Sequence, residues 1–189
     1  PELAESFRVV AFDRRGHSAS ERPEAQGSVH DDVADLAALI EHLGLGKVLA
    51  VGPSMGRLTV LQLAAAYPDH VAAIFMVDPA PFVRPPERRA RNEAMLAAME
   101  AGDQEPQRQF ITNMFLPTSD RRLVEDVLAM MLAAPRHAAV SAMRGGLAFD
   151  GPAVAAQWLP TVVNGWTVGA GHFNQLEVPD QVNAMIEAF

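Results

Sequence analysis

One serine stands at an abrupt junction between a strand pattern and a helix pattern. Residues 47–52, KVLAVG, are apolar with a single charge, which is typical of a buried strand. The next letters read G-P-S-M-G around Ser54, and residues 58–67 continue in a leucine- and alanine-rich pattern that predicts a helix. Such a short passage from strand to helix requires a tight turn at the serine. Glycines at Gly52 and Gly56 allow neighbouring backbone to pass close to that turn.

The alternation of strand and helix patterns extends to both sides of this junction. Residues 7–13, FRVVAFD, predict a short buried strand, and residues 31–43 predict an amphipathic helix with two acids in its first turn. Residues 71–80 predict a third apolar strand. Apolar strands that alternate with helices are typical of a parallel sheet covered by helices. The expected fold class is therefore α/β, with a mostly parallel sheet flanked by helices.

The middle of the sequence has a different character. Residues 83–158 carry helical patterns throughout and are rich in Met, Arg and Glu. Strand patterns return only at residues 159–165 and 167–173, and a final helix pattern follows. We therefore expect an α/β core formed by residues 1–82 and 159–189, with residues 83–158 inserted as a helical cap.

The composition excludes several classes of function. The 189-residue chain has a formal net charge of −8 and a pI of about 5.2, which argues against nucleic acid as a main partner. It contains no cysteine, so disulfides, thiolate metal sites and cysteine nucleophiles are excluded. No signal-peptide pattern opens the sequence, and no apolar run is long enough to span a bilayer. We expect a cytoplasmic protein that acts on a small molecule, with no membrane partner, no metal and no cofactor.

The G-P-S-M-G stretch matches G-x-S-x-G, the pattern of a nucleophilic serine on a strand-to-helix turn. At such a turn the Ser54 hydroxyl projects above the sheet. The backbone N–H of Met55, at the helix N-terminus, is then aimed to stabilise an oxyanion. The alternative is a serine that only caps the helix. A second serine stretch, GHSAS at residues 16–20, lacks the second glycine and a following helix, so we interpret it as a loop.

His172 is the candidate general base among the six histidines. It stands in GAGHF, a loop of small residues before the last helix, and it follows Ser54 as the order serine, acid, histidine requires. A neutral imidazole there can take the serine proton and return it to the leaving group. The alternative is a loop histidine packed on Phe173. The other five histidines are interpreted as solvated or capping side chains.

Three stretches together resemble the α/β-hydrolase fold superfamily, in particular its esterase, lactonase and non-haem haloperoxidase-like members. They are residues 9–23, 48–81 and 168–189, while the helical middle resembles the variable cap of that fold. The resemblance implies that Ser54 is the nucleophile, His172 the base and Met55 one oxyanion donor. It is specific for the superfamily and does not single out a substrate.

The sequence departs from these relatives next to the serine. Pro53 and Arg57 stand where many relatives have His and Gly. A proline is sterically awkward at this turn, and the arginine brings a bulky charge beside the serine. Together with the missing catalytic acid described below, these departures favour one alternative, a catalytically inactive binding protein on a hydrolase scaffold.

Two further departures lead us to expect a partial sequence. Only six residues precede the strand pattern at 7–13, so the glycine-rich loop that gives relatives a second oxyanion donor is absent. Gly165 and Trp166 are all that separate the apolar letters of the patterns at 159–165 and 167–173, whereas a crossover between parallel strands needs a dozen or more residues. We expect strands to be missing before Pro1, and a segment with the catalytic acid to be missing near Trp166.

The catalytic acid is the least determined member of the site. No Asp or Glu lies between Leu159 and His172, where relatives have the acid. Asp78 ends the third strand pattern, and some superfamily members place the acid after the corresponding strand. A turn-forming aspartate before a proline is the favoured alternative for Asp78. Asp150, in AFDGP, is a weaker candidate of the same kind.

The residues therefore predict a hydrolase that cleaves a carboxylic ester or a similar acyl bond through an acyl-enzyme on Ser54. A perhydrolase or haloperoxidase-like activity, or C–C bond hydrolysis, would use the same residues and stays open. Five methionines of the cap are expected to line an apolar pocket or simply to fill the core of the cap. They are Met95, Met99, Met114, Met130 and Met131.

Overall fold

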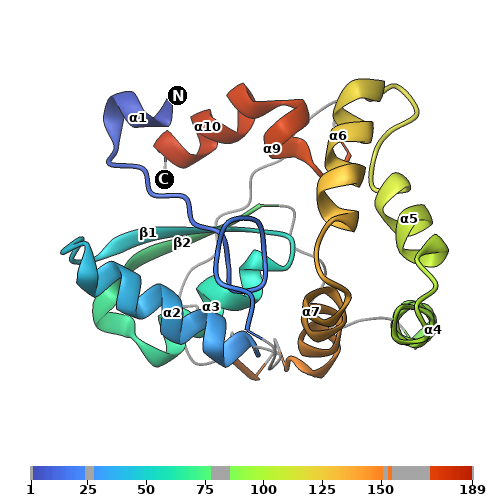
Figure 1. Cartoon of the computed structure of the whole chain (residues 1–189). Helices are drawn as coiled ribbons and strands as arrows, with labels where there is room; N and C mark the ends of the chain where they lie inside the picture. The colour runs from blue at the N-terminus through green and yellow to red at the C-terminus, as the bar shows by residue number, and fades with distance from the viewer. Residues whose placement is uncertain (1, 24–27, 78–85, 151–152, 155–170, 189) are drawn as a thin grey trace.

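The computed structural model describes residues 2–23, 28–77, 86–150, 153–154 and 171–188. Figure 1 shows a small sheet with helices above and below it, and a group of helices to one side. Among the described residues the sheet has two parallel strands, β1 (Val48–Pro53) and β2 (Val71–Val77). The helix α3 (Gly56–Ala66) and the short 3-10 helix η1 (Pro68–His70) connect them. This order confirms the α/β fold class predicted from the sequence.

Alternation along the strands divides their side chains between two faces. Ala50 and Ile74 pack on one face with α2 (Val29–His42) and α3, where Leu61 lies fully buried. Leu49 and Val77 belong to a second cluster on the other face. That cluster is completed by α1 (Leu3–Ser6) and α10 (Pro179–Ala188), which lie side by side in Figure 1. The sheet is therefore covered on both sides, as apolar parallel strands require.

The helix predicted for residues 31–43 forms as α2, which begins two residues earlier, at Val29, and ends at His42. Ser28 and Asp31 form a capping box, in which the Ser28 hydroxyl accepts from the Asp31 N–H and the Asp31 carboxylate accepts from the Ser28 N–H. Gly44 has a φ of +59° just after the helix and ends it. The expected apolar face is confirmed, since Val33 and Ile40 are buried against the sheet.

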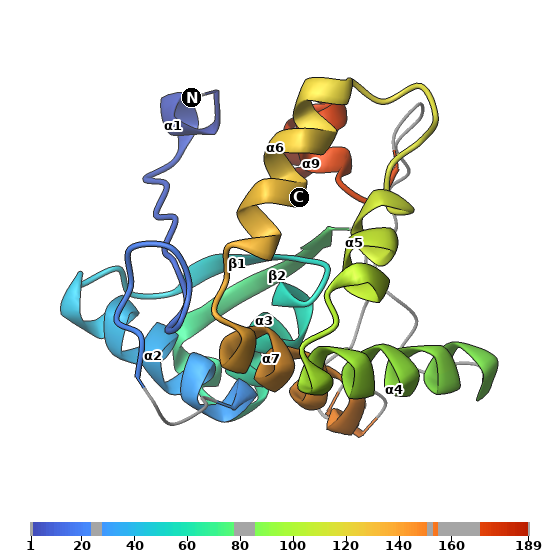
Figure 2. The same cartoon turned by 45° about the vertical axis from the view of Figure 1, so that its right-hand side comes forward.

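The middle of the chain is helical, as predicted. It contains α4 (Pro86–Ala101), α5 (Glu105–Thr112), α6 (Arg121–Leu132) and α7 (Arg136–Ala148). These helices stand beside the sheet, and Figure 2 shows α4 and α7 in contact at the base of the group. Met95 and Met99 of α4 form a buried cluster with Val140 of α7.

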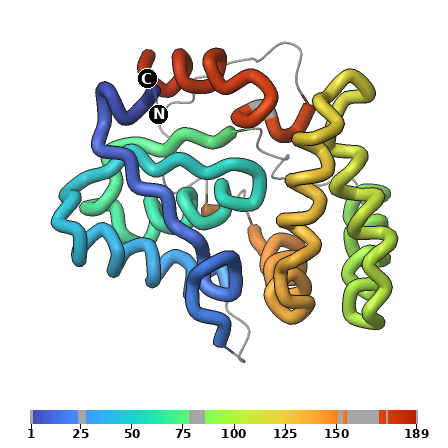
Figure 3. Tube along the Cα trace, turned by 45° about the horizontal axis from the view of Figure 1, so that its top comes forward, coloured from blue at the N-terminus to red at the C-terminus, as the bar shows by residue number. Residues whose placement is uncertain are grey.

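The buried strand predicted for residues 7–13 is wrong. The segment forms no strand, and Phe7, Val9, Val10 and Phe12 are between 39% and 53% exposed. Figure 3 shows it as an extended stretch that runs from α1 past the sheet to the loop before α2. Within the part of the chain that the structure describes, the sheet pairs only β1 with β2, so no strand neighbour covers these side chains.

Several expected elements lie wholly or partly outside the described residues. These are the end of the third strand at 78–80, the strand at 159–165, most of the strand at 167–173 and the junction near Trp166. The described end of the last stretch, Gly171 to Phe173, is loop and turn rather than strand. The final helix is confirmed as α10, preceded by the short helix α9 (Asn174–Glu177).

Candidate functional site

The turn at Ser54 has the strained geometry that the glycine pattern predicts. Ser54 follows β1 directly and has a φ of +47°, a region that residues other than glycine rarely adopt. Its N–H donates to the carbonyl of Val77 at 3.0 Å, so the turn is fastened to the end of β2. The helix α3 begins two residues later, at Gly56. Ser54 therefore stands half-buried at the carboxyl end of β1 and immediately before a helix.

Gly52 is needed for this turn because the start of α3 lies against it. A Cβ on Gly52 would lie 2.6 Å from the carbonyl carbon and oxygen of Gly56, and 2.8 Å from the Arg57 nitrogen. All three are backbone atoms, which cannot rotate away. A Cβ on Gly56 would meet only the Cδ atom of Pro53, at 3.2 Å. Of the two glycines of the motif, Gly52 is thus the one that the close approach requires.

Among the described residues, no acceptor faces the backbone N–H groups of Met55 and Gly56 after Ser54. The N–H groups of Arg57 and Leu58, by contrast, donate back into the turn. An N–H in the first turn of a helix carries part of the positive end of the helix dipole. The Met55 N–H is therefore available to an anionic oxygen beside Ser54.

Arg57 supports the turn. Its side chain is only 3% exposed, and Nη1 donates to the Ser54 carbonyl oxygen at 3.0 Å. The Arg57 N–H reaches the same oxygen at 3.3 Å. The bulky charge expected beside the serine is thus directed to the backbone of the turn. Pro53, which was expected to be sterically awkward at this turn, is the last residue of β1. Its side chain is exposed and its peptide bond is trans.

Ser54, Met55 and His172 line the same cavity, which has a volume of about 2130 Å³. Single ligand sites usually occupy about 300–1,000 Å³, so this cavity is larger than one small molecule requires. It extends to the exposed segment 7–13 and to the helices of the middle segment. The five methionines singled out from the sequence all line it: Met95, Met99, Met114, Met130 and Met131. Met95 and Met99 are also buried in the helical cluster, so both expected roles occur.

His172 lies in the turn just before α9. Its N–H donates to the carbonyl of Met114 at 2.7 Å, and its ring meets the Phe173 ring edge-on at a centroid distance of 5.3 Å. His172 thus packs on Phe173, as the alternative for this residue predicts, and it also lines the cavity. The contacts recorded among the described residues include no hydrogen bond between the Ser54 hydroxyl and the His172 ring.

Of the two candidate acids, only Asp150 lies among the described residues. Asp78 lies outside the described residues. Asp150 accepts a hydrogen bond from the Ala153 N–H at 3.1 Å, which is the turn-forming role expected as its alternative. Within the described ranges, no group of three or more His, Asp or Glu side chains could hold a metal ion. No described helix is long and apolar enough to cross a membrane.

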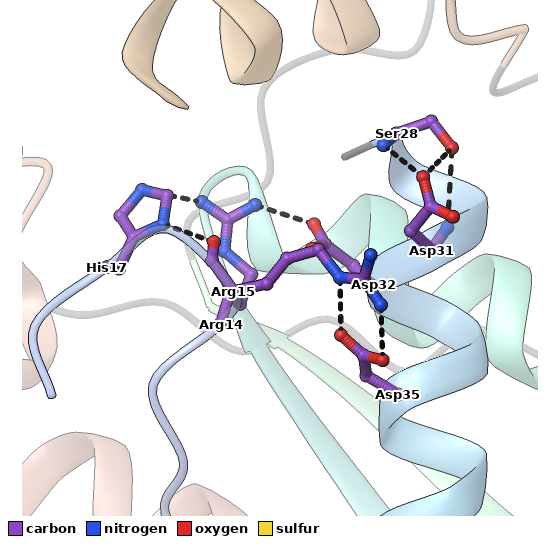
Figure 4. Close-up of polar contacts among 7 residues, drawn as sticks. All are labelled: Arg14, Arg15, His17, Ser28, Asp31, Asp32 and Asp35. Atoms are coloured by element: carbon purple, nitrogen blue, oxygen red, sulfur yellow. Dashed lines mark hydrogen bonds and ion pairs between the residues drawn. The ribbon is translucent and has the colours of Figure 1, made fainter. Parts of the chain in front are cut away.

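Ion pairs between the loop that follows the exposed segment and α2 anchor this loop (Figure 4). Arg14 Nη1 lies 2.8 Å from Asp32 Oδ2, and Arg15 binds Asp35 through two nitrogens at 2.6 and 2.7 Å. The hydrogen bonds to Asp35 raise the pKa of Arg15, while those from Ser28 lower the pKa of Asp31. This loop, Met55 and α7 together line a small cavity of about 30 Å³. The loop is therefore fixed to α2.

A comparison with protein families decides the identity of the fold. The profile of the alpha/beta hydrolase fold matches residues 1–125. The chain belongs to the α/β-hydrolase fold family. A thermophilic esterase from Thermogutta terrifontis superposes with a TM-score of 0.79 at 21% identity, over 99% of this chain and 80% of that chain. At that identity the superposition shows a shared fold and nothing about substrates.

Curated α/β-hydrolase relatives match over shorter stretches. The 2-(acetamidomethylene)succinate hydrolase of Mesorhizobium japonicum is 35% identical over 102 residues, which are 54% of this chain and 35% of that protein. The bifunctional esterase/perhydrolase DCH of Acinetobacter calcoaceticus is 39% identical over 80 residues, 42% of this chain and 29% of that protein. The matched stretches thus span about a third of these relatives' own length.

The local patterns did not point to the surroundings of His172. The Met114 carbonyl accepts from the His172 N–H, and the Glu177 carboxylate accepts from the Gly171 N–H. The Ser119 hydroxyl donates to the same carboxylate. The only signal in the sequence is the run of small residues in GAGHF, because small residues permit close backbone approach. The sequence marks Arg57 as a departure from relatives, but no local pattern predicts its contact with the Ser54 carbonyl.

Proposed function

We propose that this chain carries the nucleophile and the base of a serine hydrolase that cleaves a carboxylic ester or a similar acyl bond. The observation that carries the proposal is the Ser54 turn, with its positive φ and the available Met55 N–H, on the wall of a cavity that His172 also lines. Relatives named as a succinate-derivative hydrolase and as an esterase/perhydrolase support the same class of chemistry.

The proposed reaction has two stages. The Ser54 Oγ attacks the acyl carbon while the His172 ring takes its proton, and the Met55 N–H stabilises the oxyanion of the tetrahedral intermediate. The intermediate collapses to an acyl-enzyme, and His172 gives the proton to the departing alcohol. Water then attacks the acyl group while His172 takes its proton, and His172 returns that proton to the Ser54 Oγ as the carboxylic acid leaves. Asp78, next in the chain after Val77, is the candidate carboxylate for orienting the His172 ring.

Three alternatives are weighed against this function. A perhydrolase would use the same serine with hydrogen peroxide in place of water, and a C–C bond hydrolase would cleave a different bond there. Analysis of the products separates these activities from ester hydrolysis. The third alternative, an inactive binding protein, stays open: the Arg57 guanidinium hydrogen-bonds the Ser54 carbonyl and supports the turn, which answers one of the departures that favour it.

Labelling with a fluorophosphonate tests the nucleophile. We expect the wild-type chain to be labelled at Ser54, and Ser54→Ala to abolish both labelling and ester cleavage. His172→Ala should lose most activity, because the serine hydroxyl then has no base to take its proton. Labelling that survives Ser54→Ala would exclude Ser54 as the nucleophile. An active His172→Ala protein would require another base.

A further inference from the structure

The loop that carries His172 is held by a turn between two helices of the middle segment. This turn, residues 114–119, joins α5 to α6. The carbonyl of Met114 accepts from the His172 N–H at 2.7 Å. The rings of Phe115 and Phe173 stack with centroids 4.7 Å apart. Both the backbone of His172 and the side chain after it are therefore fixed from one side.

The fit at Gly171 shows how closely the turn 114–119 approaches the histidine loop. A Cβ on Gly171 would lie 2.4 Å from the Met114 carbonyl oxygen and 3.1 Å from the Phe115 Cα. These are backbone atoms of the turn, so a larger residue could not be accommodated by a change of rotamer. The two backbones are thus packed directly against each other.

Glu177, the last residue of α9, joins the histidine loop to the same turn. Its Oε2 accepts from the Gly171 N–H at 2.8 Å, and its Oε1 accepts from the Ser119 hydroxyl. The Ser119 Oγ in turn accepts from the Leu116 N–H at 3.0 Å, which closes the turn. Hydrogen bonds to a carboxylate are about twice as strong as those between neutral groups. In Figures 1 and 2, α9 accordingly lies beside α6.

We propose that Glu177 is a positioning residue for His172: it holds the backbone that precedes the histidine and locks that backbone to the turn 114–119. This inference rests on the proposed function, in which His172 is the base. Each Glu177 carboxylate oxygen already accepts a hydrogen bond, one from Gly171 and one from Ser119. Glu177 therefore acts on the reaction through the location of the His172 ring and does not touch the substrate.

The test compares Glu177→Ala with Glu177→Gln and with Glu187→Ala in the full chain. Glu187 lies exposed on the neighbouring helix α10 and has no recorded side-chain contact with the described residues, so it is the matched control. Displacement of a reacting group by about 1 Å can lower a rate about 10²-fold. We expect Glu177→Ala to lower kcat by about that factor, with KM changed by less than about threefold, and to alter the acid limb of the pH profile. Glu177→Gln keeps one acceptor oxygen and should recover activity to within about tenfold of wild type.

Two measurements keep the proposal testable if a variant is unstable or the chain is inactive. Ser119→Ala removes one of the two hydrogen bonds to Glu177 and should lower kcat by a smaller factor, about tenfold. The NMR signals of the His172 ring, assigned with His172→Gln, should shift in Glu177→Ala and stay in place in Glu187→Ala.

The outcomes separate this inference from the proposed function. A Glu177→Ala protein with a lower Tm, a wild-type kcat and pH profile, and unshifted His172 signals would overturn the positioning role. Activity that survives both Ser54→Ala and His172→Ala would instead overturn the proposed function. In that case the NMR comparison would still decide whether Glu177 sets the location of the His172 ring.

Discussion

Replacing Gly52 by alanine tests the turn that presents Ser54. A Cβ at this position would lie 2.6 Å from the Gly56 carbonyl carbon and oxygen, whereas non-bonded carbon atoms pack at about 3.5–4.0 Å. The new methyl group would thus be too close by roughly 1 Å. Because β1 is paired with β2 and the atoms it meets are backbone, the first turn of α3 must move by a similar amount.

The size of the effect follows from that displacement. Forcing an extra methyl group into a packed site typically costs about 1–3 kcal/mol of folding stability. A shift of about 1 Å between a nucleophile and its partners can lower the rate about 10²-fold. We therefore expect Gly52→Ala to remain folded with a lower Tm, and to lose about 10²-fold in both fluorophosphonate labelling and ester cleavage.

Gly56→Ala is the matched control for this experiment. Its Cβ would meet only the Pro53 Cδ, at 3.2 Å, so a few tenths of an ångström suffice to relieve the contact, and alanine favours the helix that begins there. The assays are the labelling rate, kcat for a chromogenic ester and thermal unfolding followed by circular dichroism. Wild-type labelling by Gly52→Ala, or equal losses in both variants, would refute the argument from close backbone approach.

Three further outcomes are expected. Because Ser54 has a φ of +47°, which disfavours a side chain by about 1 kcal/mol, Ser54→Gly should be inactive but more stable than Ser54→Ala; equal Tm values would contradict this. Hydrogen bonds from Ser28 lower the pKa of Asp31 below 3.8, so its stabilisation is present above that pH and is lost as the pH falls through the lowered value. Urea unfolding should show a stability gap between wild type and Asp31→Ala at pH 7 that shrinks as the pH falls below 3.8, and an unchanged gap would argue against it. Leu61 is 0% exposed, so Leu61→Ala should cost about 2–5 kcal/mol in the same assay, against less than about 1 kcal/mol for the exposed Leu116→Ala.

Elements with local signals could be predicted from the sequence. The capping residues and the apolar stripe of α2 lie within one short stretch of sequence. The turn at Ser54 is specified by the five consecutive residues G-P-S-M-G. Hydrophobic periodicity and turn chemistry act between residues that are close in the sequence, so the sequence alone is enough to predict these elements. The helical character of residues 86–148 was predicted for the same reason.

The burial of residues 7–13 could not be predicted in this way. An apolar strand pattern says which side chains favour burial, but the neighbouring strands decide whether they are buried. The surroundings of His172 are a second example, because the hydrogen bond between Ser119 and Glu177 joins residues that are 58 positions apart. Neither residue belongs to a motif, and only the folded chain brings them together.

The contact between the turn 114–119 and Gly171 limits how freely this protein can be rearranged. A helical insertion is an attractive unit to exchange between hydrolases when a new substrate preference is wanted. Here the helical middle segment also supplies the Met114 carbonyl and the Phe115 ring that hold the loop of His172. A chimera that received helices from another hydrolase would need a turn of the same shape, or the foreign helices and the native histidine loop would have to be transplanted together.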